Sequence, residues 1–88
     1  MDQMTETAHD ILYQFFRDAG LSQFGAAKAM GISKGHMSRI LRGEREITNS
    51  FLWCFQNTFV RANAPFYLPQ AGSVMHEIEQ HRTNGGAS

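Results

Sequence analysis

The run Leu21-Ser-Gln-Phe-Gly-Ala-Ala-Lys-Ala-Met-Gly-Ile-Ser-Lys-Gly-His-Met-Ser-Arg-Ile-Leu-Arg-Gly43 decides the fold. Two serines in it, Ser22 and Ser33, stand where helix N-caps are expected, and the two short helices that they begin end at Gly31 and Gly43. A sharp turn between two such helices needs a residue that tolerates positive φ, which Gly31 supplies. The residues placed to fill the angle between the helices are apolar or small: Ala26, Ala27, Met30, Ile32, Met37, Ile40 and Leu41.

Helices are also expected on both sides of this run. Residues 8–19 carry apolar side chains at the i, i+3, i+4, i+7 spacing of an amphipathic helix, with Thr7 and Asp10 resembling a capping box and Gly20 ending it. A fourth helix is predicted from Thr48 or Asn49 to about Asn63, since Pro65 forbids continuation.

The C-terminal part is expected to be simpler. Residues 64–72 form an irregular apolar connector, Ser73 begins a short helix to about Arg82, and residues 83–88 form a disordered tail. No strand-like alternation occurs in the sequence. We therefore expect a compact all-α bundle of four or five helices, with residues 1–63 as the main domain and 64–82 as a dimerisation segment.

Length and composition limit the class of protein. The chain has 88 residues, enough for one domain, and 42% of them are hydrophobic, seven being Phe. Its single cysteine, Cys54, forbids an internal disulfide and fits a reducing compartment. No apolar run approaches the roughly 18 residues of a membrane span. The expectation is a soluble, cytoplasmic protein without membrane contact.

Charge is unevenly distributed although the formal net charge is zero. From Lys28 to Arg45 the chain holds five basic residues and one acid, Glu44, whereas the first eighteen residues hold four acids and one base, Arg17. Such a dipolar layout suits a protein that meets a polyanion with one face.

The helix after Ser33 combines this charge with an apolar side. At about 100° per residue, Met37, Ile40 and Leu41 share the side that faces the core. The opposite side carries Gly35, Arg39 and Arg42, with Ser38 and His36 beside them and Lys34 at the N-terminal end. A helix of this kind fits a DNA major groove about 12 Å wide, where Gly35 permits close approach and Arg39 is placed to bind a guanine. The alternative, which stays open, is an ordinary solvated basic face.

The segment resembles the helix-turn-helix of the Cro and phage-repressor (Xre-like) family. The resemblance lies in Gln23, Ala27, Gly31, Met37 and Ile40, with the Leu-Ser-Gln opening and the Gly-Ile-Ser turn, and it extends more weakly over residues 8–63. It implies a lambda-repressor-like fold. Phe24 departs from the family pattern, which usually has a polar residue there.

The resemblance also implies site residues. Positions that face bases in the family are occupied by Lys34, Gly35, Ser38 and Arg39, and positions that contact the DNA backbone by Gln23, Ser33, His36, Arg42, Arg45, Thr48 and Asn49. For His36 a phosphate contact and a plain surface position remain equally open. The implied function is sequence-specific binding of double-stranded DNA by a transcriptional regulator, most simply a repressor that acts as a homodimer on a palindromic operator.

A dimer is also favoured by an apolar strip on the fourth helix. Trp53 and Val60 lie seven residues apart, nearly opposite the arc of Phe51, Leu52, Phe55 and Phe59. Either the connector folds back over this strip or a second subunit covers it. The predicted dimer interface consists of Trp53, Val60, Phe66, Tyr67, Leu68, Val74 and Ile78.

Other functions are less well supported by the sequence. The main alternative is an antitoxin or another protein-interaction module of the same fold, whose apolar residues 66–78 would bind a toxin or other partner. No constellation typical of an enzyme occurs, and no cofactor or metal is expected: His76 and His81 are five residues apart, which puts them on different helix faces. RNA binding would need stacking aromatics beside the basic residues, and the sequence is interpreted as lacking them.

Overall fold

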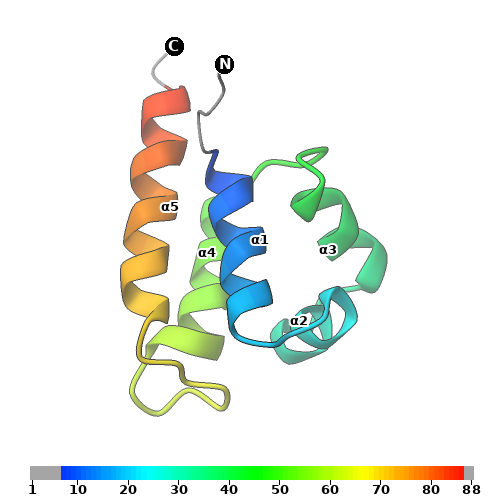
Figure 1. Cartoon of the computed structure of the whole chain (residues 1–88), viewed down its shortest axis with the longest axis vertical. Coiled ribbons are helices and arrows are strands. Elements are labelled where there is room, and N and C mark those ends of the chain that lie inside the picture. Colours follow the sequence, from blue (N-terminus) through cyan, green and yellow to red (C-terminus); the bar gives the residue numbers. More distant parts are fainter. Residues whose placement is uncertain (1–6, 87–88) are drawn as a thin grey trace.

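The computed structural model describes the backbone of residues 7–86 and the side chains of residues 7–82. Within this range the chain is all-helical: α1 (Ala8–Asp18), α2 (Gln23–Met30), α3 (Lys34–Leu41), α4 (Asn49–Phe55), a π-helical turn η1 (Gln56–Val60) and α5 (Ala71–Gly86). In Figure 1, α1 lies in front of α4, with α5 on one side and the α2–α3 pair on the other. The all-α prediction is confirmed for the described residues.

The helix boundaries follow the caps that the sequence contains. Thr7 Oγ1 accepts a hydrogen bond from Asp10 N (3.1 Å) and Thr7 N donates to Asp10 Oδ2 (3.2 Å), the reciprocal capping box predicted for α1. At the starts of α2, α3 and α4, the side-chain oxygens of Ser22, Ser33 and Thr48 each accept one backbone hydrogen bond. Gly31 ends α2 with φ +72°, the left-handed conformation that its place in the turn requires.

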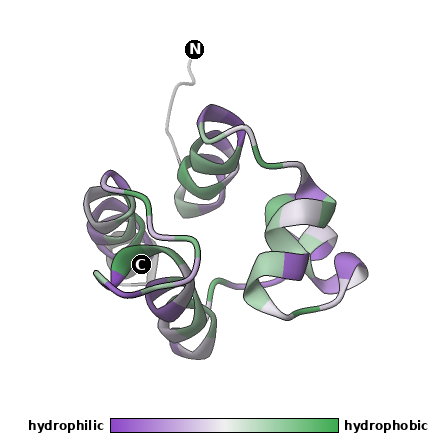
Figure 2. Cartoon of the chain, turned by 90° about the horizontal axis from the view of Figure 1, so that it is seen from below, coloured by the Kyte–Doolittle hydropathy of each residue, from purple (hydrophilic) through white to green (hydrophobic). Residues whose placement is uncertain are grey.

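An aromatic cluster forms the centre of the core. Phe15 and Phe16 of α1 contact Phe55 of α4 and Phe59 of η1, with ring centroids 5.1–6.4 Å apart. All four rings are at most 3% exposed, and burying each stabilises the fold by roughly 1.5–3 kcal/mol. Figure 2 shows hydrophobic residues concentrated on the helix sides that face one another.

The fourth helix is shorter than predicted. It ends at Val60 and not near Asn63, because the connector folds back onto its end: Phe66 N donates to the Thr58 carbonyl (3.1 Å) and Leu68 N to the Phe59 carbonyl (2.9 Å). These are the carbonyls that a continuing α-helix would use four residues later, so long-range pairing replaces the last predicted turn.

The C-terminal helix is longer than predicted and belongs to the main core. α5 begins at Ala71, two residues before Ser73, and its backbone continues through residues 83–86, which were expected to be disordered; residues 87–88 lie outside the described part. Ala71 and Ile78 are completely buried in the core cluster that α1 to α4 also form, and α5 packs against α1 and η1. Residues 71–82 are therefore part of one packed body.

Candidate nucleic-acid interface

α3 is fixed to the bundle by one side and exposed on the other. Met37 and Ile40 are 0% and 1% exposed, whereas Lys34, Gly35, His36 and Arg39 are exposed and Ser38 is partly buried. This is the division that the helical wheel predicts, except that Leu41 is only partly buried. A Cβ added to Gly35 would meet only Arg39 Nη1, at 3.8 Å, so the outer surface at Gly35 is unobstructed.

The start of α2 lies beside the start of α3. The Lys34 ammonium sits 5.5 Å from the centroid of the Phe24 ring, a cation–π contact between the first residue of α3 and the second of α2. Phe24 is 59% exposed, so its ring lies under Lys34 and not in the core. Gln23, predicted to contact a phosphate, is exposed next to it.

The other predicted backbone-contact residues occupy three kinds of position: Ser33, Arg42 and Thr48 are helix caps, Arg45 lies in the loop between α3 and α4, and His36 and Asn49 lie in the first turns of α3 and α4. Arg42 and Arg45 are exposed, and Arg42 pairs with Glu44 (Nε to Oε2, 3.0 Å). The hydroxyl oxygens of Ser33 and Thr48 accept hydrogen bonds from His36 N (3.0 Å) and Phe51 N (3.1 Å), so they hold the helix starts in place. Together with the exposed residues of α3 they make one mainly basic stretch, whose basic residues are Lys34, Arg39, Arg42 and Arg45.

Two side chains that sequence reasoning missed hold the α3–α4 loop. His9 Nε2 lies 2.8 Å from the Arg45 carbonyl, and Arg82 donates from Nη1 to the Ile47 carbonyl (2.7 Å) and from Nη2 to Asn49 Oδ1 (2.6 Å). The contacts span 33 to 36 residues, which explains why no local motif announces them. The one signal in the sequence is that Arg82 follows the apolar Ile78 by four residues, on the same helix face.

The predicted dimer interface divides into three groups. Trp53, Phe66 and Tyr67 are exposed by 62%, 50% and 48%. Val60, Leu68 and Val74 are partly buried against the core of their own chain. Ile78 is 0% exposed, so its assignment to an interface is wrong: the same side chain packs inside the monomer. The connector folds onto the end of η1 and leaves Trp53 open.

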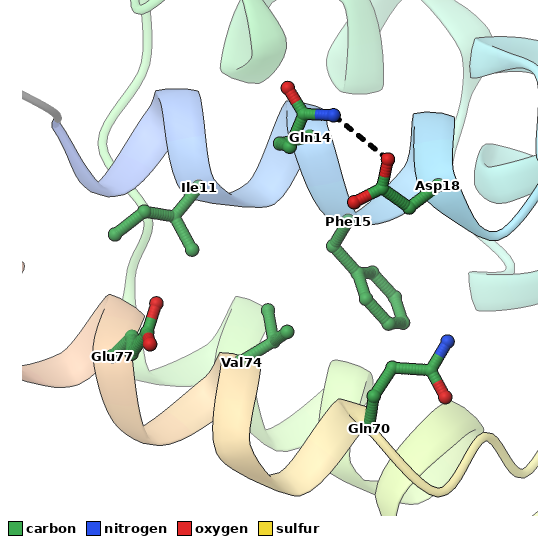
Figure 3. A pocket seen from close by; sticks show the side chains of 7 residues that line it. All are labelled: Ile11, Gln14, Phe15, Asp18, Gln70, Val74 and Glu77. Atoms are coloured by element: carbon green, nitrogen blue, oxygen red, sulfur yellow. Dashed lines mark hydrogen bonds between the residues drawn. The ribbon is translucent and has the colours of Figure 1, made fainter.

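A cleft of about 270 Å³ lies between α1 and α5 (Figure 3). Ile11, Phe15 and Val74 give it an apolar wall, and four polar residues complete it: Gln14, Asp18, Gln70 and Glu77. Gln14 Nε2 donates to Asp18 Oδ1 (2.9 Å), so part of its polar lining is already paired. In Figure 1 α5 and α3 stand on different sides of α1, which separates this cleft from the basic stretch.

In the described part of the chain no group of three or more His, Cys, Asp or Glu residues could hold a metal ion. His76 Nε2 contacts Gln80 and His81 Nδ1 contacts the Glu77 carbonyl, each within its own helix turn. Cys54 is partly buried and its thiol donates to the Met30 carbonyl (3.0 Å). In the described part of the chain no helix has the length and apolarity needed to cross a membrane.

Comparisons with models of protein families, with curated proteins and with solved structures found no match.

Proposed function

We propose that the chain is a helix-turn-helix protein of the lambda-repressor-like type that binds double-stranded DNA through α3 and regulates transcription. The observation that carries the proposal is the two-sided character of α3: Met37 and Ile40 anchor it, and the opposite face presents Lys34, Gly35 and Arg39 to solvent. Because these anchors lie on the side away from the solvent, α3 can enter a major groove without any change in the fold.

In this proposal the contact residues form two groups, according to whether they reach the bases or the sugar-phosphate backbone. Lys34, Gly35, Ser38 and Arg39 face the bases, with Arg39 donating to a guanine. Gln23, Ser33, His36, Arg42, Arg45, Thr48 and Asn49 contact the sugar-phosphate backbone and set the register. Charge supports the proposal in a limited way: Arg42 is paired with Glu44, and Glu46 is a second exposed acid in the loop.

Homodimerisation belongs to the same proposal. A two-fold dimer places its two recognition helices about 34 Å apart on a palindromic site. The exposed aromatic side chains of Trp53, Phe66 and Tyr67 supply apolar surface for such an interface. The same aromatics favour the second candidate function, an antitoxin or similar module in which a protein partner covers them.

Selection of bound sequences from a random duplex library tests the proposal, with the full chain at low and physiological salt. Enrichment of a palindrome with half-sites one helical turn apart is expected. Folded protein that enriches no sequence at low salt contradicts it, and co-purification with the product of a neighbouring gene would then favour the second candidate.

A further inference from the structure

We infer that Arg82, at the far end of the chain, is a positioning residue for DNA-backbone binding, because it fixes which hydrogen-bonding group Asn49 offers to the phosphate. The inference rests on the proposed function and names the residue that orients one of its phosphate contacts.

Packing determines where Arg82 lies. Ile78 is fully buried, and Arg82 follows it by one turn on the same face of α5. The Arg82 guanidinium thereby reaches the start of α4, where it bonds the Ile47 carbonyl (2.7 Å) and Asn49 Oδ1 (2.6 Å). Ile47 itself is 2% exposed, so the loop is held by its side chain and by its carbonyl at once.

The chemistry of the pair fixes the Asn49 amide. A guanidinium has donors only, so the Asn49 group that faces it must be the acceptor, Oδ1. The Nδ2 hydrogens are then left for another partner, and within residues 7–82 the Asn49 side chain has no hydrogen bond besides the one to Arg82. Asn49 is exposed at the end of the basic stretch, so it presents a donor, which is what a phosphate oxygen needs.

A second long-range contact, made by a residue of α1, holds the same loop. His9 Nε2, 2.8 Å from the Arg45 carbonyl, holds the backbone that carries the Arg45 side chain. The loop between α3 and α4 is therefore tied to α1 and α5, neither of which belongs to the proposed helix-turn-helix of α2 and α3. The backbone contacts are set before DNA arrives, which lowers the ordering cost of binding.

The experiment is a double-mutant cycle on affinity for the selected duplex, with Arg82→Gln, Asn49→Ala and the double variant. Each single change is expected to weaken binding about three- to tenfold, the loss of one phosphate contact among several. The double variant is expected to bind no more weakly than the singles, because Arg82 acts through Asn49. Arg82→Lys, which keeps the positive charge and a single donor nitrogen, should restore part of the affinity.

Two further variants separate positioning from folding and from bulk charge. Asn49→Asp keeps an acceptor for Arg82, and so the fold, but loses the Nδ2 donor and should bind at least about tenfold more weakly because it adds a charge repelled by phosphate. Arg61→Gln removes the same charge from an exposed residue at the other end of the α4–η1 helix, where its guanidinium donates to Asn57 Oδ1, and should bind within about twofold of the unaltered chain.

The outcomes are distinct. If the unaltered chain binds and Arg82→Gln or Asn49→Asp binds equally well, the inference is overturned. Additive losses in the cycle also overturn it, because Arg82 would then contact the phosphate directly. If the unaltered chain binds no duplex at all, the proposed function fails and the inference with it.

Discussion

Arg42 and Glu44 form an ion pair at the end of α3, with Nε and Oε2 3.0 Å apart and both side chains more than half exposed. One cation of the basic stretch is thus paired within the chain, although exposed pairs of this kind contribute only about 0–1 kcal/mol to stability.

Glu44→Gln should release Arg42 for a phosphate. We expect about two- to fivefold tighter binding to every duplex, specific or not, with little change in the free energy of unfolding, since the pair that is lost is weak. Fluorescence anisotropy with labelled duplexes measures the affinity. Glu79→Gln, an exposed acid on α5, is the matched control and should change it less. Equal effects of the two changes would show that only net charge matters.

Arg39→Ala and Arg45→Ala should differ in kind. Arg39→Ala should cost roughly 1–3 kcal/mol of binding free energy and relax specificity at one base pair. Arg45→Ala should weaken all sequences alike and reduce the slope of log K against log[salt] by about 0.9. Binding profiles over a panel of single-base operator variants make the comparison. Identical profiles for both variants would contradict the division into base and backbone contacts.

Two glycines of the α2–α3 segment should respond in opposite ways to alanine. Gly31→Ala should lower the free energy of unfolding by roughly 1–2 kcal/mol, because φ is +72° there although space for a Cβ is open. Gly35→Ala should raise it by up to about 1 kcal/mol, since Gly35 lies within α3 and the added Cβ makes ordinary contact. Urea unfolding measures both. Gly35→Ala should nevertheless weaken DNA binding, and unchanged affinity would mean that α3 does not approach the bases at this residue.

Ile78→Ala should destabilise the monomer. A fully buried Ile replaced by Ala leaves a cavity between α5 and the core, at a cost of about 2–5 kcal/mol in the free energy of unfolding. Val74→Ala, at the partly open cleft, is the control and should cost less. If Ile78→Ala changed the mass in solution while stability stayed the same, the assignment of Ile78 to the core would be wrong.

Trp53→Asp should split a dimer and leave the fold intact, because the side chain is 62% exposed and takes no part in the core. Light scattering after size exclusion distinguishes the 9.9 kDa monomer from a species of twice that mass. Tyr13→Asp, an exposed aromatic on α1, is the control. An unaltered chain that is monomeric at high concentration, or a Trp53→Asp variant that stays dimeric, removes Trp53 from the interface.

The sequence predicted local structure well and long-range structure poorly. Caps at Thr7, Ser22 and Ser33 are decided by hydrogen bonds that span three residues, and these were found. The end of the fourth helix at Val60 depends on amides of the returning connector, which no local pattern encodes. Ile78 was assigned to an interface for a related reason, since an apolar face shows that something covers it but not what does.

The candidate site was likewise predicted where local periodicity decides it and missed where long-range packing does. Exposure of Lys34, Gly35 and Arg39 follows from helical periodicity, because the buried positions Met37 and Ile40 fix the rotation of α3. The Arg82 contacts depend instead on how α5 lies across the bundle. Periodicity places a residue on a face, and only the packed structure says which partner that face meets.

Trp53 is the only tryptophan in the chain, and most of its side chain lies in solvent while five phenylalanines are buried in the core. Intrinsic tryptophan fluorescence will therefore respond weakly to melting of the core and strongly to anything that covers α4. A blue shift of the emission as the protein is concentrated would report self-association, and a blue shift on adding a partner protein would report the second candidate function. A duplex bound at α3 of a chain that is already dimeric would leave the emission maximum where it was.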